Sequence, residues 1–240
     1  MSTQQSIPVA YFSAEYAIAD DLPIYAGGLG VLAADIVLQA AAENRPFMAM
    51  GLVYHQAFSG DDLDQRPIHE RLSAHGFEVA VHDGQRVTVP VQVADRTVLL
   101  QAWVKQWGQT SLVLLDSRLP ENDPQDQMIC DHLYASEHQL AMAQEICLGF
   151  GGVAMVRALG FEPKAWHLNE GHTALAGLAV ALGYLQQHPG TGLDAAVAAV
   201  KPMLAGTKHT ILPGAGLFLD WQSVELLLGP TLQEAGVHLD

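Results

Sequence analysis

The sequence predicts an α/β fold in which buried strands alternate with helices and pair in parallel. Residues 9–13 form a short apolar run typical of a buried strand, and residues 47–54 form a second one. Between them, apolar residues recur at three- and four-residue steps over residues 29–43, a spacing that indicates a helix. A strand, a helix and a strand in this order predict a βαβ unit, and open sheets of this kind bind ligands at the carboxyl ends of their strands.

A glycine-rich stretch, residues 23–35, lies between the first predicted strand and the helix. Gly27, Gly28 and Gly30 permit a tight turn and a close approach of a ligand to the backbone. The start of a helix presents unpaired N–H groups that suit phosphate or another anion. The alternative is a turn whose glycines serve packing alone. The spacing is not Gly-x-Gly-x-x-Gly and no Gly-Lys-Ser/Thr follows, so neither a dinucleotide site nor a Walker loop is predicted.

Residues 77–116 follow a different pattern, and we expect an antiparallel β meander inserted into the α/β chain. Valines alternate with other residues over residues 86–93, as in a strand with one buried face. Asp83-Gly84 is a hairpin signal just before this strand, and Pro90 favours a strand at the edge of a sheet. Residues 97–104 and 111–115 supply two further strands.

The second half of the sequence returns to helices and short strands. A helical pattern covers residues 137–158, and its glycines are expected to permit close packing against a neighbour. The residues that line its apolar face are Leu140, Ala143, Cys147, Phe150 and Ala154. The further elements expected are a strand at 165–168, helices at 171–187 and 194–200, a strand within 202–210, a turn at 213–216 and a helix at 217–228 that Gly229 and Pro230 end.

Composition limits the classes of partner. The 240 residues include 26 Asp and Glu against 11 Lys and Arg, a formal net charge of −15. Nucleic acid is therefore not expected as a partner, because phosphate backbones require basic residues, whereas a neutral sugar is compatible. No apolar run is expected to span a membrane, and the polar start shows no export signal, so we expect a cytoplasmic protein. Cys130 and Cys147 match no metal or redox spacing, and Cys147 is expected to be a buried free thiol.

A polar cluster at residues 166–173 separates a predicted strand from a predicted helix. Its planar donors and acceptors suit sugar hydroxyl groups, and His209 occupies the equivalent end of the next strand. The members of the cluster are His167, Asn169, Glu170, His172 and Thr173. Metal binding is disfavoured because the two histidines lack the four-residue spacing of a helical zinc pair. Capping of a helix by Asn169 or Thr173 stays open as an alternative.

Paired carboxylates and nucleophile motifs provide no second candidate site. Asp20 with Asp21, and Asp61 with Asp62, are expected to be solvated loop charges because each pair lies beside a turn. No Gly-x-Ser-x-Gly motif is present, which argues against nucleophilic hydrolysis.

Several sequence blocks stand in a fixed order along most of the chain. They are Tyr-Phe-Ser-Ala-Glu-Tyr at 11–16, Leu-Pro-Ile-Tyr-Ala-Gly-Gly-Leu-Gly-Val-Leu-Ala-Ala-Asp at 22–35, Gly-Leu-Val-Tyr at 51–54, Leu-Leu-Asp at 114–116, Pro-Glu-Asn at 120–122, Gln-Glu at 144–145, Leu-Gly-Phe-Gly-Gly-Val at 148–153, His-Leu-Asn-Glu-Gly-His at 167–172, and His-Thr at 209–210 with Pro213. Together they resemble the amino-terminal portion of the α-glucan (glycogen, starch and maltodextrin) phosphorylases, closest to the short bacterial and archaeal branch.

The resemblance implies a GT-B fold, in which two Rossmann-like domains enclose an active site between them. It also implies reversible phosphorolysis of α-1,4-glucan to glucose 1-phosphate, with pyridoxal phosphate as the cofactor. The residues that the resemblance places at this site are Gly28, Leu29 and Gly30 in a loop facing phosphate and glucose, His172 and His209 in contact with the glucosyl unit, and Glu15, Asn169 and Glu170 in support.

The sequence departs from the family's pattern at its cofactor site. The family's cofactor lysine lies in the carboxyl-terminal domain, and none of Lys105, Lys164, Lys201 and Lys208 corresponds to it. We therefore expect residues 1–240 to form an amino-terminal GT-B-like domain that needs a second chain or domain to supply the cofactor. Residues 57–59 also read Ala-Phe-Ser where the family has Gly-Tyr-Phe, and residues 213–216 lack a polar residue usual in the family.

Two other functions remain open. One is a non-catalytic glucan-binding or regulatory module. The other is half of a nucleotide-sugar glycosyltransferase such as glycogen synthase, which also uses a Gly-Gly-Leu-Gly loop; the block at 167–172 favours a phosphorylase. A phosphorylase half is expected to expose apolar area where its partner domain would pack.

Overall fold

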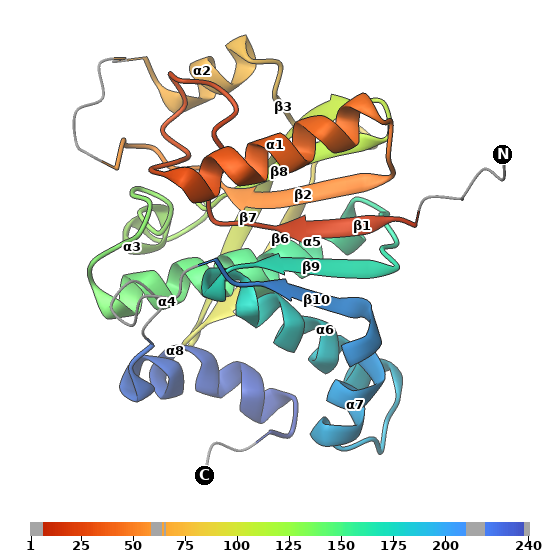
Figure 1. The fold of residues 1–240 in the computed structure, drawn as a ribbon. Coiled ribbons are helices and arrows are strands. Elements are labelled where there is room, and N and C mark those ends of the chain that lie inside the picture. Colours follow the sequence, from red (N-terminus) through yellow and green to blue (C-terminus); the bar gives the residue numbers. More distant parts are fainter. Residues whose placement is uncertain (1–6, 59–63, 65, 210–218, 238–240) are drawn as a thin grey trace, which may run out of the picture.

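A mixed eight-stranded sheet runs through the centre of the molecule (Figure 1). The computed structural model describes residues 7–58, 64, 66–209 and 219–237. The strands β10-β9-β1-β2-β8 are neighbours in this order and parallel. Their bounds are β1 Val9–Phe12, β2 Phe47–Leu52, β8 Thr110–Asp116, β9 Ala165–Asn169 and β10 Leu204–Thr207. The predicted α/β fold with a largely parallel sheet is confirmed, so the carboxyl ends of these strands share one edge.

The first strand, helix α1 (Gly28–Ala42) and the second strand form the predicted βαβ unit. The helix buries Ala33, Val37 and Ala40 and packs against β2 and β8. Figure 1 shows α1 in front of the sheet and α5 behind it. Because the helix begins at Gly28, the glycine-rich stretch forms its first turn at the carboxyl end of β1.

The longest helical run crosses the core as α4 (His138–Ile146), the π-helical turn η1 (Cys147–Gly151) and α5 (Gly152–Ala158). The sheet covers one side of this run, while α6 and α8 cover others. All five residues of the predicted apolar stripe are buried or packed against the core, but the buried surface is wider than that stripe, because Met142 and Ile146 are fully buried as well. The predicted stripe residues that are only half-buried are Leu140, Phe150 and Ala154. Cys147 is a buried free thiol, as predicted, and so is Cys130.

Glycines let this run approach its neighbours closely, as predicted. A Cβ atom on Gly149 would lie 2.7 Å from Leu175 Cβ, and one on Gly152 would lie 2.5 Å from Phe12 Cε1. Both distances are too short for real Cβ contacts. The low helix propensity of glycine is thus offset by packing between the helix, the sheet and α6.

The same run is long and apolar enough to cross a membrane, contrary to the expectation that no apolar run would be. Residues His138–Ala158 meet this condition by length and composition only. However, 72% of the apolar window is buried inside the fold. The run is the central core helix of this structure, and its composition is weak support for a membrane span.

Residues 77–116 pair antiparallel with one another and end in the main sheet. Strand β6 pairs antiparallel with β7, and β7 with β8, whereas β8 pairs in parallel with β2. The last predicted strand of the segment thus belongs to the central sheet rather than to a separate insertion. The bounds are β3 Glu78–Val79, β4 Val81–His82, β5 Gln85–Arg86, β6 Thr88–Val93 and β7 Arg96–Trp107. The predicted hairpin turn at Asp83-Gly84 joins β4 and β5, and Pro90 lies on β6, whose pairing within the described residues is with β7 alone.

The remaining elements follow β9 in the predicted order. They are η2 Gly171–Thr173, α6 Ala174–Gln187, α7 Leu193–Val200, η3 Lys201–Met203 and, after β10, α8 Trp221–Glu234; α2 Ile68–Ala74 and α3 Pro124–Gln127 are short helices earlier in the chain. The prediction that Gly229 and Pro230 end the last helix is wrong, because α8 continues through Pro230 to Glu234. Leu228 and Leu232, on either side of Pro230, are buried. Their burial offsets the free-energy cost of the backbone hydrogen bond that proline cannot make. The predicted turn at 213–216 lies outside the described residues, and so does the expected start of this helix at 217.

Asp21 is not the solvated loop charge predicted. Its carboxylate lies 2.6 Å from His75 Nε2 and 3.2 Å from Arg66 Nη2, so it joins its loop to α2 and to the segment before α2. Asp20 is exposed, as expected, and Asp61 and Asp62 lie outside the described residues.

Replacing Gly152 by alanine should destabilise the protein. The added Cβ would meet Phe12 Cε1 at 2.5 Å and Met50 Cγ at 2.9 Å, and overpacking of a core costs about 1–3 kcal/mol. Gly229→Ala is the matched control, because nothing lies within 4 Å of a Cβ built there, and it should leave stability unchanged or raise it by up to about 1 kcal/mol. Urea denaturation of both variants measures this, and a G152A midpoint equal to that of the wild type would disprove the close approach.

Candidate functional site

The carboxyl ends of three neighbouring strands bring the predicted polar side chains to one edge of the sheet. Glu15 follows β1, Asn169 ends β9 and His209 follows β10, with β9 lying between the other two strands. Figure 1 shows these strand ends close to the start of α1. Residues that are 156 positions apart touch here, since Asn169 Nδ2 donates to Ser13 Oγ over 3.3 Å.

Glu15 holds the glycine-rich loop in place. Its side chain is buried, and Oε2 accepts hydrogen bonds from the backbone N–H groups of Ala26 at 2.7 Å and Gly27 at 3.0 Å. The other carboxylate oxygen accepts a hydrogen bond from the hydroxyl of Tyr134. A carboxylate with several backbone donors forms strong, charge-assisted hydrogen bonds, so the loop is fixed before any ligand arrives.

The loop residues Gly28, Leu29 and Gly30 form the first turn of α1 beside Glu15. A Cβ on Gly30 would lie 2.6 Å from Tyr25 Cβ and 3.0 Å from Glu15 Oε2, so no larger residue fits there. A Cβ on Gly28 would meet nothing within 4 Å, which leaves its backbone approachable. The first N–H groups of a helix lack the usual partner four residues earlier. Here the Gly30 N–H donates to the Gly27 carbonyl over 3.2 Å, so the N–H groups of Gly28 and Leu29 are the ones left for the predicted anion.

Asn169 and Glu170 together fix His209. His209 Nε2 donates to Asn169 Oδ1 over 2.9 Å, and the backbone N–H of His209 donates to the Glu170 carboxylate. Glu170 has a φ of 68°, a strained conformation for a residue with a side chain, and its own N–H donates to the Thr207 carbonyl over 2.8 Å. The structure thus brings three of the predicted residues into one hydrogen-bonded group.

His172 stands in the short helix η2 next to Tyr134, with 5.0 Å between the two ring centres. Its Nδ1 is buried and has no hydrogen-bond partner among the described residues. Burial lowers the pKa of His172, and the charges of Glu170 and Glu15 oppose this only in part. The side chain is therefore neutral at pH 7 and offers a ring nitrogen to a ligand.

The other members of the predicted cluster have local roles. His167 Nε2 lies 2.5 Å from Thr207 Oγ1, which ties β9 to β10. The capping alternative is wrong, because neither the 3₁₀ turn η2 nor α6 receives a side-chain cap. Thr173 instead donates its hydroxyl to the Glu170 carbonyl over 2.9 Å.

Sequence patterns miss two residues of the site, Tyr134 and Glu145. Tyr134 lies in a loop with no periodicity, and its positive φ of 57° is invisible in the sequence. Glu145 lies on α4, is 5% exposed and has a carboxylate oxygen, Oε2, with no hydrogen-bond partner among the described residues. Both residues line a cavity of about 170 Å³ together with His172. Burial raises the pKa of Glu145 to about 8, so this side chain is largely a neutral acid at pH 7.

The chemistry of this edge suits neutral hydroxyl groups. It combines two carboxylates, a neutral imidazole, an amide and exposed backbone N–H groups, the set of donors and acceptors that sugars use. Within the ranges that the structure describes, no three His, Cys, Asp or Glu side chains gather as a metal site would require.

Comparison with known proteins gives this site a family context. The chain is 34% identical to the maltodextrin phosphorylase of Thermococcus litoralis over 213 residues, and 34% identical to the glycogen phosphorylase of Mycobacterium tuberculosis over 224 residues. The glycogen phosphorylase of Aquifex aeolicus is 31% identical over 214 residues. These matches cover 85–87% of this chain but only 25–30% of the relatives. No family model matches the chain.

This chain is related to part of the α-glucan phosphorylases. The predicted resemblance is thereby confirmed, and the chain spans about a quarter of the length of the first relatives it matches.

The lysines of the described part do not fit a pyridoxal phosphate site. Lys164, Lys201 and Lys208 are exposed, and Lys105 lies on β7 with its ammonium 5.0 Å from the ring centre of Trp107. The three cavities described for this structure have no lysine among their lining residues. The cofactor of the family thus has no lysine site among these residues.

Replacing Glu15 by glutamine should loosen the glycine-rich loop. The charge-assisted hydrogen bonds to Ala26 and Gly27 become neutral ones of about half the strength, so amide hydrogen exchange at these residues should accelerate about tenfold. Glu43→Gln, an exposed change at the other end of α1, is the control and should leave both amides unaffected. Unchanged exchange in E15Q would show that Glu15 does not hold the loop.

Replacing Glu145 by glutamine should stabilise the protein at high pH only. The pKa of Glu145 is raised by burial to about 8 in the folded protein, above its value of about 4.3 in an unfolded chain. The folded state therefore binds the extra proton, so the contribution of Glu145 to stability is complete below about pH 4 and is lost as the pH rises towards 8.

Glutamine imitates the neutral acid at every pH. E145Q should match the wild type at or below about pH 4 and exceed it by a few kcal/mol near pH 8.5, at about 1.4 kcal/mol per pKa unit. The other titratable groups that line the same cavity, and whose charge bears on the pH dependence of stability, are Tyr54, Tyr134, His138 and His172. Urea denaturation at both pH values measures the difference, and a pH-independent effect of E145Q would contradict a raised pKa.

Proposed function

We propose that this chain is the sugar-facing, amino-terminal part of a glycosyltransferase of the α-glucan phosphorylase type. The reaction is reversible phosphorolysis of α-1,4-glucan to glucose 1-phosphate, and residues 1–240 form the amino-terminal domain of a GT-B fold. The observation that carries this proposal is the group of fixed polar side chains at the ends of β1, β9 and β10, next to the glycine-rich start of α1. The relatives named as maltodextrin and glycogen phosphorylases support it.

The proposed contacts to the glucosyl unit come from His172 and His209. His209 is half of a hydrogen-bonded pair with Asn169, which orients its ring. His172 is neutral and has a buried nitrogen to offer. A sugar hydroxyl can both donate to and accept from such groups, and neither histidine needs to change its charge on binding.

The proposed place of substrate phosphate is the first turn of α1, at Gly28, Leu29 and Gly30. The N–H groups of Gly28 and Leu29 and the helix dipole favour an anion at such a turn, whereas the Gly30 N–H donates to the Gly27 carbonyl. Glu15, although negative, faces the N–H groups of Ala26 and Gly27, which partly neutralise it. It therefore supports the loop without occupying the anion position.

The proposed enzyme needs pyridoxal phosphate and a cofactor-binding part in addition to residues 1–240. That part comes either from the same polypeptide or from a second chain, since the lysines of the described part do not fit the role. Phe58, which is 55% exposed and in ring contact with Tyr134, offers such a part an apolar side chain beside the site. The proposed partners are otherwise glucan and phosphate, in the cytoplasm, with no nucleic acid or membrane.

The test combines glucan binding with phosphorolysis. Maltoheptaose titrated into the protein should bind, and His209→Ala should weaken the affinity about tenfold, the scale of one or two lost hydrogen bonds. His188→Ala, which removes an exposed histidine stacked on Tyr184, should bind as the wild type does.

An assay of phosphorolysis then distinguishes part of an enzyme from a non-catalytic binding module. With pyridoxal phosphate, maltodextrin and inorganic phosphate, the chain should release glucose 1-phosphate only when a complementing cofactor-binding half of a related phosphorylase is added. If this chain alone formed a stoichiometric Schiff base and turned over, the proposal that a separate part binds the cofactor would be wrong. If the complemented mixture bound glucan but released no glucose 1-phosphate, the proposal that the chain belongs to an enzyme would be wrong.

A further inference from the structure

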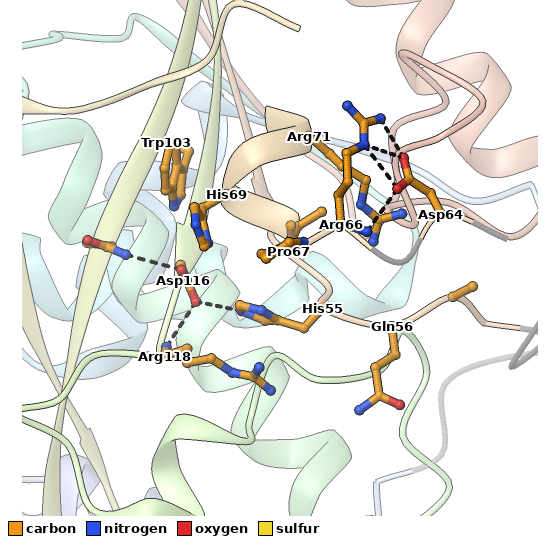
Figure 2. Close-up of a pocket in the computed structure, with 13 residues that line it drawn as sticks. His55, Gln56, Asp64, Arg66, Pro67, His69, Arg71, Trp103, Asp116 and Arg118 are labelled. Carbon is orange, nitrogen blue, oxygen red and sulfur yellow. Dashed lines mark hydrogen bonds and ion pairs between the residues drawn. The ribbon is translucent and has the colours of Figure 1, made fainter. Parts of the chain in front are cut away.

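A second and larger cavity, of about 790 Å³, lies at the carboxyl ends of β2 and β8 (Figure 2). It is on the same sheet, displaced from β1 towards β7. His55 follows β2, Asp116 ends β8 and Arg118 comes just after it. Gln101 and Trp103 line the cavity from β7. The function proposed above uses none of these residues.

Asp116 is the fixed centre of this cavity. Its side chain is 6% exposed, and its Oδ1 accepts hydrogen bonds from His55 Nε2 at 3.0 Å and from the backbone N–H of Arg118 at 2.9 Å. Oδ2 accepts from Gln101 Nε2 at 3.1 Å. Burial alone would raise the pKa of Asp116, but these donors, with His55 first, hold it below its ordinary value. Figure 2 shows the carboxylate facing these groups at the cavity wall.

The cavity also contains an unsatisfied donor. The indole N–H of Trp103 is buried and has no hydrogen-bond partner among the described residues. An indole N–H can only donate, so a ligand that satisfies it must bring an oxygen acceptor. His69, exposed on α2, adds an imidazole to the rim of the cavity beside Trp103 (Figure 2).

Charge favours a neutral ligand over an anion. The Arg118 guanidinium is paired with Asp131, and Arg66 is paired with Asp64 and Asp21. The chain as a whole carries a formal net charge of −15, which repels anions at long range. Arg71, which also lines the cavity, is buried and donates to the Asp21 carbonyl over 3.0 Å. A ligand with many hydroxyl groups and no charge offers an acceptor to the Trp103 indole and leaves these charged groups with their partners.

We propose that this cavity is a second saccharide-binding site, which takes glucosyl units of the same α-glucan at a distance from the unit at His172 and His209. The proposal rests on the proposed function, because it extends the glucan along the sheet edge. Neighbouring strands are about 4.8 Å apart, so β8 lies roughly 10 Å from β1, and an oligosaccharide of several units can reach both sites. His55, Asp116 and Trp103 form the wall, and Arg118 and His69 form the rim.

The test measures maltoheptaose binding to a rim variant and a matched control. The rim variant carries Arg118→Ala and His69→Ala, both on partly exposed side chains. The control carries Arg86→Ala and His82→Ala, which likewise remove one acid-paired arginine and one exposed histidine, but outside the cavity. The Trp103 indole N–H cross-peak, assigned with Trp103→Phe, reports occupancy by NMR. An unchanged cross-peak pattern elsewhere establishes that each variant is folded.

The expected result is a shift of the Trp103 cross-peak with maltoheptaose, and an affinity about tenfold weaker in the rim variant only. The wild type could bind maltoheptaose with an affinity that His209→Ala weakens, yet show no shift of the Trp103 cross-peak and no loss of affinity in the rim variant. That result would overturn this inference and leave the proposed function standing. Failure of the wild type to bind maltoheptaose at all would overturn both. A shift of Trp103 by inorganic phosphate and not by maltoheptaose would overturn the assignment of a neutral saccharide.

Discussion

The parallel alignment of β10, β9, β1, β2 and β8 is the constraint on which the site depends. Strands β2 and β8 are buried along their whole length, so their polar chemistry is confined to the residues that follow or end them. Because all five strands point the same way, these ends meet at one edge. The cavity at His172 and the cavity at Asp116 are two stretches of that edge, one beyond β1 and β9 and one beyond β2 and β8.

A single carboxylate connects the elements around the first stretch. Glu15 binds the loop before α1 through Ala26 and Gly27, and binds the segment before α4 through Tyr134. Tyr134 in turn packs on His172. A change in any one of these parts therefore reaches the others, and the geometry of the site is set jointly by β1, α1 and the start of α4.

Local signals in the sequence were enough for most of the framework. Short apolar runs identified β1 and β2, and periodicity identified α1. The Asp83-Gly84 turn identified a hairpin, and Pro90 identified an edge strand. The errors arose where packing overrode local preference. Burial of α8 carries it through Pro230. Likewise, neighbours on several sides of the central helix bury Met142 and Ile146 in addition to the predicted stripe.

The sequence alone determined the strand–helix framework and the relation to the phosphorylases, and it singled out Glu15, Asn169, His172 and His209 as candidates that the fold brings to one edge of the sheet. Only the tertiary structure decided which side chains meet them. Tyr134 contacts Glu15, 119 residues away along the chain, and His55 contacts Asp116, 61 residues away. Periodic patterns describe neighbours within one helix or strand, so they cannot predict such contacts. The protonation of Glu145 was decided there too, because a pKa depends on how much water the fold removes from a carboxylate, and no short stretch of sequence contains that information.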